Sequence, residues 1–304
     1  MKRYIARHIN QKKYEVGCAP SDRSFKSVWG WTDDLITDSI VYSHRKTDYS
    51  SAEFDENAHI HDHYELVIFA NGDVDFVTES EIITPSPVSA ALFAPSAVHN
   101  TRLRSASVYE RYVFYFYPNI FTFSGMTAPF GELLDCTNGS KIWQIPSDRQ
   151  GELLRGLGRL DNELSKDTPN PLLCYIRTMG IFDILSDTSN APAPSGESLP
   201  PKMLEIQKYI DKCYTDITSV SQIAEHFFYS REYISRMFKK YYNVSVSDYL
   251  ARLRIIRAIE LMGNGASVTD ACFSVGFGST SAFYLSFRKI MGMSPSEYIK
   301  RSKY

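Results

Sequence analysis

The chain has 304 residues, 43% of them hydrophobic and 22% charged, which favours two domains that each bury a core. Its apolar runs fall short of the ~20 residues of a membrane-spanning helix, its N-terminus lacks an apolar stretch, and its five cysteines form no CxxC pair, so we expect a cytoplasmic protein with reduced thiols. The net charge of −2 hides an asymmetry: from Pro201 onward 15 Lys/Arg stand against 9 Asp/Glu, which suits a polyanionic partner.

Residues ~20–120 contain short runs rich in β-branched and aromatic residues, separated by turn residues. The clearest runs are "YELVIFANGDVDFVT", "SAALFAPSA" and "SVYERYVFYFYP". Many short strands at nearly regular spacing predict a barrel or a sandwich.

Three histidines and a carboxylate occupy alternate positions in this region, at His59, His61, His63 and Glu65. In a strand these four side chains point to one face, because strand side chains repeat with period two. Such a row could hold a metal ion, or it could line the pocket of a protein that senses a small molecule. The row alone leaves both interpretations open.

From Ser147 the apolar period becomes helical. Leucines keep helical spacing from 153 to 164, Ser147 with Gln150 forms a capping box, and a second helix is expected from Pro171 to about Ser186. The two helices could pack on the strand-rich region or pair with a second copy of the chain. Residues 186–201, rich in Pro, Ser, Gly and Ala, predict an extended, mobile linker.

Residues 219–242 predict two helices separated by a short break at Tyr229-Ser230. The first carries Ile223, Ala224 and Phe227 inward, and the second has one apolar stripe and one polar, basic face. That arrangement is typical of a helix-turn-helix, in which Arg can contact guanine and Lys can contact phosphate. The outward residues are Arg231, Glu232, Ser235, Arg236, Lys239 and Lys240.

Residues 267–292 repeat this layout, with a turn at Gly276–Gly278 and an outward face of Thr280, Ser281, Tyr284 and Arg288. Between the two units, residues 247–262 predict a helix of ~24 Å that could hold two recognition helices about one DNA turn apart, ~34 Å. It places Arg252, Arg254 and Arg257 where they could meet phosphates.

The stretch "SREYISRMFKKYYNVSVSDYLARLRIIRAIELM", followed by "SVTDACFSVGFGSTSAFYLSFRKIMGMSPSEYIKR", resembles the DNA-binding domain of the AraC/XylS transcription regulators. The resemblance covers about residues 201–304. It implies base contacts from Glu232, Ser235 and Arg236 in the first unit and from Thr280, Ser281 and Tyr284 in the second. One departure is Leu285, which stands where the second helix of the family usually offers Arg.

The same resemblance implies a cupin barrel as sensor domain, and residues 59–72 fit the first cupin motif, HxHx3Ex6G. In metal cupins this motif binds an ion with a later histidine, a set that suits Fe(II). The second motif, PxGxxH, is incomplete: "PSAVH" (95–99) lacks the glycine and one residue. We therefore favour a small-ligand pocket for a polyol or sugar over a metal site, lined by His61, Glu65 and His99, with Arg111 and Trp143 as weaker candidates. A bound ion and structural histidines that satisfy hydrogen bonds inside the barrel stay as alternatives.

The sequence thus predicts an α+β, two-domain fold: a cupin-like β-barrel with appended helices and an all-α double helix-turn-helix domain. The expected divisions are a ligand-sensing barrel (1–145), a helical dimerisation region (146–188), a linker (189–200) and the DNA-binding domain (201–304). No nucleophile arrangement and no GxxxxGK[ST] motif occurs, so no enzyme and no cofactor is expected.

The expected function is a ligand-responsive transcription regulator that binds double-stranded DNA as a homodimer, has no membrane partner, takes a small effector such as a sugar, and could contact RNA polymerase. Two alternatives remain: a metal-dependent cupin enzyme fused to a DNA-binding domain, and a ligand-independent regulator whose barrel only dimerises.

Overall fold

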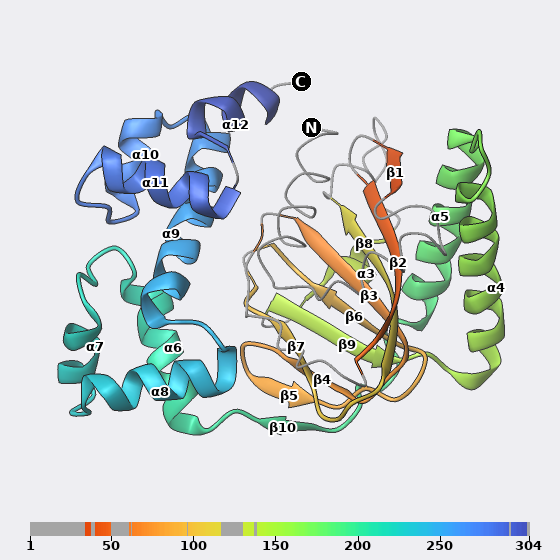
Figure 1. Ribbon diagram of the computed structural model, residues 1–304, viewed down its shortest axis with the longest axis horizontal. Helices are drawn as coiled ribbons and strands as arrows, with labels where there is room; N and C mark the ends of the chain where they lie inside the picture. The colour runs from red at the N-terminus through yellow and green to blue at the C-terminus, as the bar shows by residue number, and fades with distance from the viewer. Residues whose placement is uncertain are drawn as a thin grey trace.

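The structure is a computed structural model that describes residues 34–37, 40–49, 61, 63–95, 97–116, 130–136, 139–291 and 293–302. The described residues form a strand-rich N-terminal part and an all-helical C-terminal part, which lie side by side (Figure 1). The predicted α+β, two-domain fold class is confirmed. None of the described helices is long and apolar enough to cross a membrane.

The strand-rich part contains two antiparallel sheets. One has the strand order β1-β2-β8-β3-β6-β9 and the other the order β10-β5-β4-β7. The strands are β1 (Asp34–Thr37), β2 (Ile40–Asp48), β3 (Tyr64–Asn71), β4 (Val74–Val77), β5 (Glu81–Ile83), β6 (Ser89–Phe93), β7 (Asn100–Leu103), β8 (Val108–Phe116), β9 (Ser140–Gln144) and β10 (Gly196–Ser198).

Both faces of the six-stranded sheet are buried, because each faces a different apolar cluster. On one face, Val67, Ala91 and Ile142 are in register across β3, β6 and β9 and belong to a cluster that includes Phe76 of the second sheet. One residue along, Ile68, Ala90 and Trp143 point the other way. This period-two alternation gives the sheet an inner face toward the second sheet and an outer face toward helices.

The outer face is covered by α4 (Ser147–Leu164) and α5 (Pro171–Thr188), two helices at the positions that the sequence predicts (Figure 1). Buried leucines of α4 share one cluster with Trp143 and Phe182. Asn170 caps α5 by accepting hydrogen bonds from the amides of Leu172 and Leu173. The expected capping box at Ser147 is wrong: the N-cap is Pro146, and Gln150 donates to the Ile145 carbonyl instead. A short helix, α3 (Gly131–Leu134), also belongs to this part.

The linker prediction requires one correction. Residues 186–201 were expected to be extended and mobile, but Gly196–Ser198 form β10, which pairs with β5. The Leu199 amide then donates to the Ser80 carbonyl at 2.9 Å. The end of the linker is therefore attached to the four-stranded sheet immediately before the helical part begins.

The helical part consists, within the residues that the structure describes, of seven helices around an apolar cluster that also includes Val41, Val77 and Val98 of the strand-rich part. They are α6 (Pro201–Cys213), α7 (Val220–His226), α8 (Arg231–Tyr242), α9 (Val246–Gly263), α10 (Val268–Ser274), α11 (Thr280–Met291) and α12 (Pro295–Ser302). Serine side chains cap six of them by accepting a hydrogen bond from a backbone amide of the first turn. At ~1.5 Å per residue, the 18 residues of α9 give a rod of ~27 Å.

Candidate nucleic-acid interface and ligand site

The first helix-turn-helix unit consists of α7 and α8. Ile223 and Ala224 of α7 are buried, as are Ile234, Met237 and Phe238 of α8. Burial of one stripe leaves the opposite face of α8 to solvent. All six residues predicted for that face are exposed, namely Arg231, Glu232, Ser235, Arg236, Lys239 and Lys240.

The second unit consists of α10 and α11 and follows the same plan. Ala271, Cys272, Phe283 and Phe287 are buried. Of the residues predicted for its outward face, Ser281, Tyr284 and Arg288 are exposed and Thr280 is partly exposed. Leu285 has 72% of its surface exposed, so this face carries an apolar residue where α8 carries Arg236.

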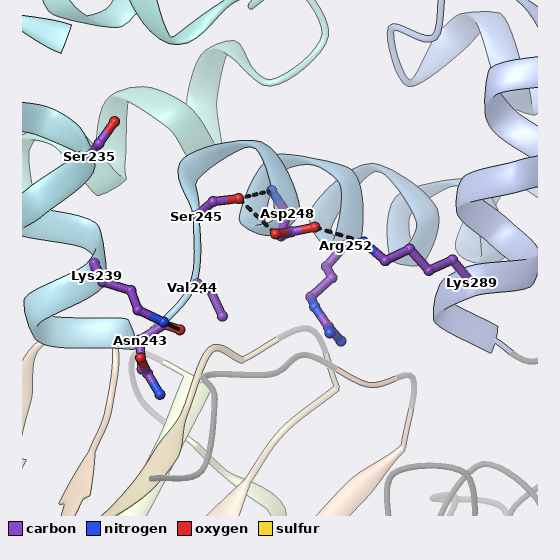
Figure 2. A pocket seen from close by; sticks show the side chains of 8 residues that line it. All are labelled: Ser235, Lys239, Asn243, Val244, Ser245, Asp248, Arg252 and Lys289. Carbon is purple, nitrogen blue, oxygen red and sulfur yellow. Dashed lines mark hydrogen bonds and ion pairs between the residues drawn. The ribbon is translucent and has the colours of Figure 1, made fainter. Parts of the chain in front are cut away.

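A basic pocket of about 440 Å³ lies between the two units (Figure 2). Lys239 reaches it from α8, Arg252 from α9 and Lys289 from α11. Lys289 donates to the Asp248 carboxylate at 3.1 Å, and the Ser245 hydroxyl donates to the same carboxylate at 2.7 Å. Ser245 and then Lys289 hold the pKa of Asp248 below its usual value. Three cations around a pocket of this size suit a phosphate group.

Two of the three arginines expected to meet phosphate make contacts within the helical part. Arg254 donates to the backbone carbonyls of Tyr214 and Ile217, which ties α9 to the loop after α6. Arg257 forms an ion pair with Glu260. The expectation is therefore corrected for Arg254, whose guanidinium is bound to backbone carbonyls; the partly exposed Arg257 stays a prediction, and Arg252 lines the basic pocket.

Lys289 was not among the residues predicted from the sequence. It sits one residue after Arg288, where the first unit has Lys240, so aligning the two units by their buried aromatic residues would have identified it. Its proximity to Lys239 depends on how α8 and α11 pack on α9, which the sequence does not show.

The strand-rich part brings His61, Glu65 and His99 together. All three are buried, and one ligand atom from each lies within 4.8 Å of the others. The Glu65 Oε2 atom is 3.0 Å from His61 Nε2 and 3.2 Å from His99 Nε2. His63 stacks on His61 with ring centroids 4.2 Å apart, and His59 lies outside the described residues.

Backbone contacts determine which nitrogen of each histidine faces Glu65. His61 Nδ1 is 2.7 Å from the His63 carbonyl and His99 Nδ1 is 3.1 Å from the Ala97 carbonyl. A carbonyl only accepts, so each Nδ1 carries a proton, and in a neutral ring Nε2 then presents a lone pair. Burial, followed by His63, holds the pKa of His61 well below its usual value.

Two imidazole Nε2 atoms therefore converge on one carboxylate oxygen. Two imidazoles and one carboxylate, with the remote nitrogens oriented by carbonyl groups, are also the ligand set and outer contacts of many transition-metal sites. The residues present therefore fit a divalent metal ion.

The remaining ligand candidates lie elsewhere. Arg111 pairs with Phe69 on the same inner face as Glu65, but four residues further along β3, or ~13 Å, and it packs on the Tyr109 ring at 4.3 Å. Trp143 is on the outer face, where it is fully buried and its Nε1 donates to Thr188 of α5 at 3.3 Å. Trp143 is thus a core residue, and its assignment to the pocket is corrected.

Comparison with known proteins identifies the family of the helical part. Residues 223–301 match the family described as "Helix-turn-helix domain". The transcriptional regulatory protein HptR of Staphylococcus aureus is 31% identical over 99 residues, 33% of this chain and 39% of the relative. The Msm operon regulatory protein of Streptococcus mutans is 31% identical over 107 residues, 35% of this chain and 38% of the relative. This chain thus spans about two fifths of the length of these relatives.

Two solved structures resemble the chain more distantly. An apo variant of ToxT from Vibrio cholerae has 17% identity and a TM-score of 0.37, and the similarity covers 88% of this chain and 98% of ToxT. The C-terminal domain of AraT from Geobacillus stearothermophilus has 28% identity and a TM-score of 0.33, with 34% and 87% covered. At these TM-scores neither likeness bears on function.

The C-terminal part of the chain is therefore a helix-turn-helix domain with two units joined by α9. More particularly, it is a domain of the AraC type, the family that its sequence resembles.

Proposed function

We propose that the chain is a DNA-binding transcription regulator whose strand-rich part senses a small ligand. One observation carries the proposal: two exposed polar helix faces, on α8 and α11, flank a basic pocket at which α8, α9 and α11 meet. In this proposal α8 and α11 enter adjacent major grooves, and the intervening phosphates lie against Lys239, Arg252 and Lys289.

The two units read DNA differently in this proposal. Arg236 and the neighbouring polar residues of α8 contact base edges through hydrogen bonds. Leu285 and Tyr284 of α11 offer apolar contact, for which the methyl group of thymine is the natural partner. Arg231, Lys239, Lys240 and Arg288 contact phosphates at the edges of both helices.

The proposed ligand site is the cluster of His61, Glu65 and His99. The His99 ring stacks on Phe93 with centroids 3.9 Å apart, so polar atoms lie above an apolar floor. That combination supports the carbohydrate expected from the sequence, because sugars need directed hydrogen bonds over an apolar surface. Contact with a sugar would require Glu65 to exchange its present histidine partners for hydroxyl groups.

The convergence of two Nε2 atoms on Glu65 favours a second candidate, a divalent metal ion as the sensed species. His61, Glu65 and His99 would hold it, and the ion would supply an electrophilic centre for an oxygen ligand. Thermal melting with sugars and with Zn²⁺ or Co²⁺ separates the candidates. A rise with sugars alone supports carbohydrate sensing, a rise with metal that His61→Ala abolishes supports metal sensing, and no rise with either contradicts ligand sensing at this cluster.

We also propose that the active form is a homodimer. Four large apolar side chains of α4 and α5 are exposed: Leu154, Leu172, Leu173 and Ile176. Exposed apolar patches of this kind mark interfaces. Sedimentation of the full chain and of Leu172→Ser tests the proposal, because a monomeric wild type or a dimeric variant would contradict it. Contact with RNA polymerase remains a prediction.

The DNA-binding proposal is tested by selecting bound sequences from a random duplex pool with the full chain. Enrichment of a defined site, lost in Arg236→Ala and retained in Arg155→Ala, is the expected result. Arg155 is a matched control because it is an exposed arginine of α4, away from the helix-turn-helix units. Absence of any enriched site with the wild-type chain would contradict sequence-specific binding.

A further inference from the structure

The turn between β4 and β5 lies against the first helix-turn-helix unit. The Glu79 carbonyl is 3.4 Å from the Tyr242 hydroxyl at the end of α8, and that hydroxyl also bonds to Gln207 of α6. Val77 and Val98 of the strand-rich part belong to the same buried cluster as Tyr242 and the rest of the helical core. The two parts of the chain therefore share a continuous packed interface at this turn.

The Glu79 side chain points back into the strand-rich part. Its Oε1 accepts a hydrogen bond from the Val98 amide at 3.0 Å. Gly139, with φ +78°, lies against both this segment and Glu79: a Cβ atom there would be 3.1 Å from the Ala97 Cβ and 3.7 Å from the Glu79 Cδ. The Gly139 carbonyl accepts from the Ala94 amide at 2.9 Å. Residues 97–99 thus contact both Glu79 and the loop before β9.

Neighbouring residues of this segment face opposite directions. The Val98 side chain is buried with the helical core, whereas the His99 side chain reaches Glu65 in the ligand site. His99 Nδ1 also donates to the Ala97 carbonyl, which couples the orientation of the ring to the backbone. A ligand that turns the His99 ring breaks its bond to the Ala97 carbonyl, which belongs to the same planar peptide unit as the Val98 amide.

We propose that Glu79 and residues 97–99 form a latch that couples occupancy of the ligand site to the position of the first helix-turn-helix unit. This proposal rests on the proposed sensing function and adds the residues through which the ligand site would affect the helix-turn-helix domain. When His99 changes partner, the Val98 amide shifts, Glu79 loses its hydrogen bond, and the turn no longer holds Tyr242 and α6. The helix-turn-helix domain then samples other positions, and its DNA affinity changes.

The electrostatics of Glu79 support such a role. Burial and, less strongly, the charge of Asp211 on α6 raise the pKa of Glu79 to about 7, whereas the Val98 amide and Arg257 of α9 act in the opposite direction. Tyr242 of α8 faces Glu79 as well, and burial raises its pKa well above the usual value, so it remains a neutral hydroxyl. A carboxyl group balanced in this way responds strongly to a small change in its hydrogen bonding.

The proposal is tested by a double-mutant cycle in the full chain. DNA affinity is measured for the wild type, His99→Ala, Glu79→Ala and the double variant. We expect His99→Ala to change affinity about fivefold or more in the wild-type background, the lower end of ordinary allosteric coupling, and to have little effect when Glu79 is already alanine. Equal effects in both backgrounds, or no effect in either, would overturn the latch.

Hydrogen exchange on the wild type and on Glu79→Ala, Glu79→Gln and Glu197→Gln separates failure of the latch from failure of the proposed function. Glu79→Ala should accelerate amide exchange in α6 and α8 even if no DNA site is found, whereas Glu79→Gln, which keeps an acceptor for the Val98 amide, should not. Glu197→Gln on neighbouring β10 is the control, because its side chain is exposed. Unchanged exchange in Glu79→Ala would overturn the latch. If His99→Ala does not fold, His99→Gln replaces it in the cycle.

Discussion

The two helix-turn-helix units share a backbone plan but differ in the chemistry that they present. Their recognition helices α8 and α11 are both 12 residues long, and each buries aromatic residues against α9. On the outer face, however, Arg236 of the first unit is matched by Leu285 of the second, and Ser235 by Tyr284. Similar packing thus preserves the fold of each unit and leaves its outer face free to differ, so one domain offers DNA two kinds of contact.

The turns of the two units also share a backbone conformation but differ in their surroundings. Both place one residue in the left-handed region: Phe228, with φ 57°, and Gly276, with φ 88°. A Cβ atom at Gly276 would lie 2.2 Å from the Thr215 carbonyl oxygen, whereas the Phe228 side chain is 96% exposed. The second turn therefore requires glycine because the loop after α6 lies against it, and the first turn tolerates a large residue at some conformational cost.

The largest expected effect is on the free energy of unfolding, from substitutions in the two turns. Gly276→Ala should lower the free energy of unfolding by about 2–4 kcal/mol, because it adds both a left-handed strain and a clash with backbone. Phe228→Gly should leave stability unchanged or raise it by up to about 1 kcal/mol. Urea denaturation of the two variants measures both, and equal losses would show that the turns are equivalent after all.

The next largest expected effect is on DNA affinity, from substitutions on the recognition helices. Arg236→Ala should weaken specific DNA binding by about 1–3 kcal/mol and relax the base preference at one position. Leu285→Ala, at the matching place on α11, should cost less than about 1 kcal/mol, since it removes only an apolar contact. Binding curves on the selected site and on single-base variants measure both. A uniform loss over all sequences would identify Arg236 as a phosphate contact.

The interface of the first unit with the strand-rich part predicts a pH dependence between about pH 5 and 7, from the raised pKa of Glu79. The pKa of Glu79 is about 7 in the packed interface, above its ordinary value, so packing is favoured by protonation. The stabilisation is fully present below the ordinary pKa and decreases as pH rises toward 7, by about 1–2 kcal/mol after allowance for solvent screening. Amide exchange in α8 should thus be slower at pH 5.5 than at pH 7.5, after correction for intrinsic rates. The Glu79→Gln variant should lose this difference.

The smallest effects come from the basic pocket. Arg252→Ala and Lys289→Ala should each weaken DNA binding by a similar factor for all sequences and reduce the slope of log affinity against log salt by about 1. Lys166→Ala is the control, because Lys166 lies between α4 and α5, outside the helix-turn-helix units, and pairs with Glu163. A change in base preference without a change in salt slope would contradict the phosphate assignment.

Much of the architecture could be predicted because its signals are local. The apolar periods of α4, α5, α8 and α11 are strong, and serine caps mark several helix starts. The gathering of His61, Glu65 and His99 was also expected, although His99 lies 34 residues from Glu65, because the motif implied it.

Other features depend on contacts that no local pattern encodes. Trp143 was assigned to the wrong face because β9 lies between two apolar layers, so its sequence does not alternate between polar and apolar residues. Arg254 could not be distinguished from Arg252, because its partners are backbone carbonyls about 40 residues earlier in the chain. The short polar strand β10 forms only because β5 offers an edge, and the latch depends on the packing of two separately folded parts.

The pairing of β10 with β5 also determines how far the DNA-binding domain can travel. With the strand paired, only Leu199 and Pro200 connect it to α6, a tether of about 7 Å. If the three residues of β10 and the Leu199 amide detach, residues 193–200 are released after the Pro192 carbonyl, which accepts from the Gln144 amide, and they can extend to about 26 Å. Two copies of the chain could then occupy operator halves separated by different numbers of base pairs, so three backbone pairings decide which spacings in a promoter can be bridged.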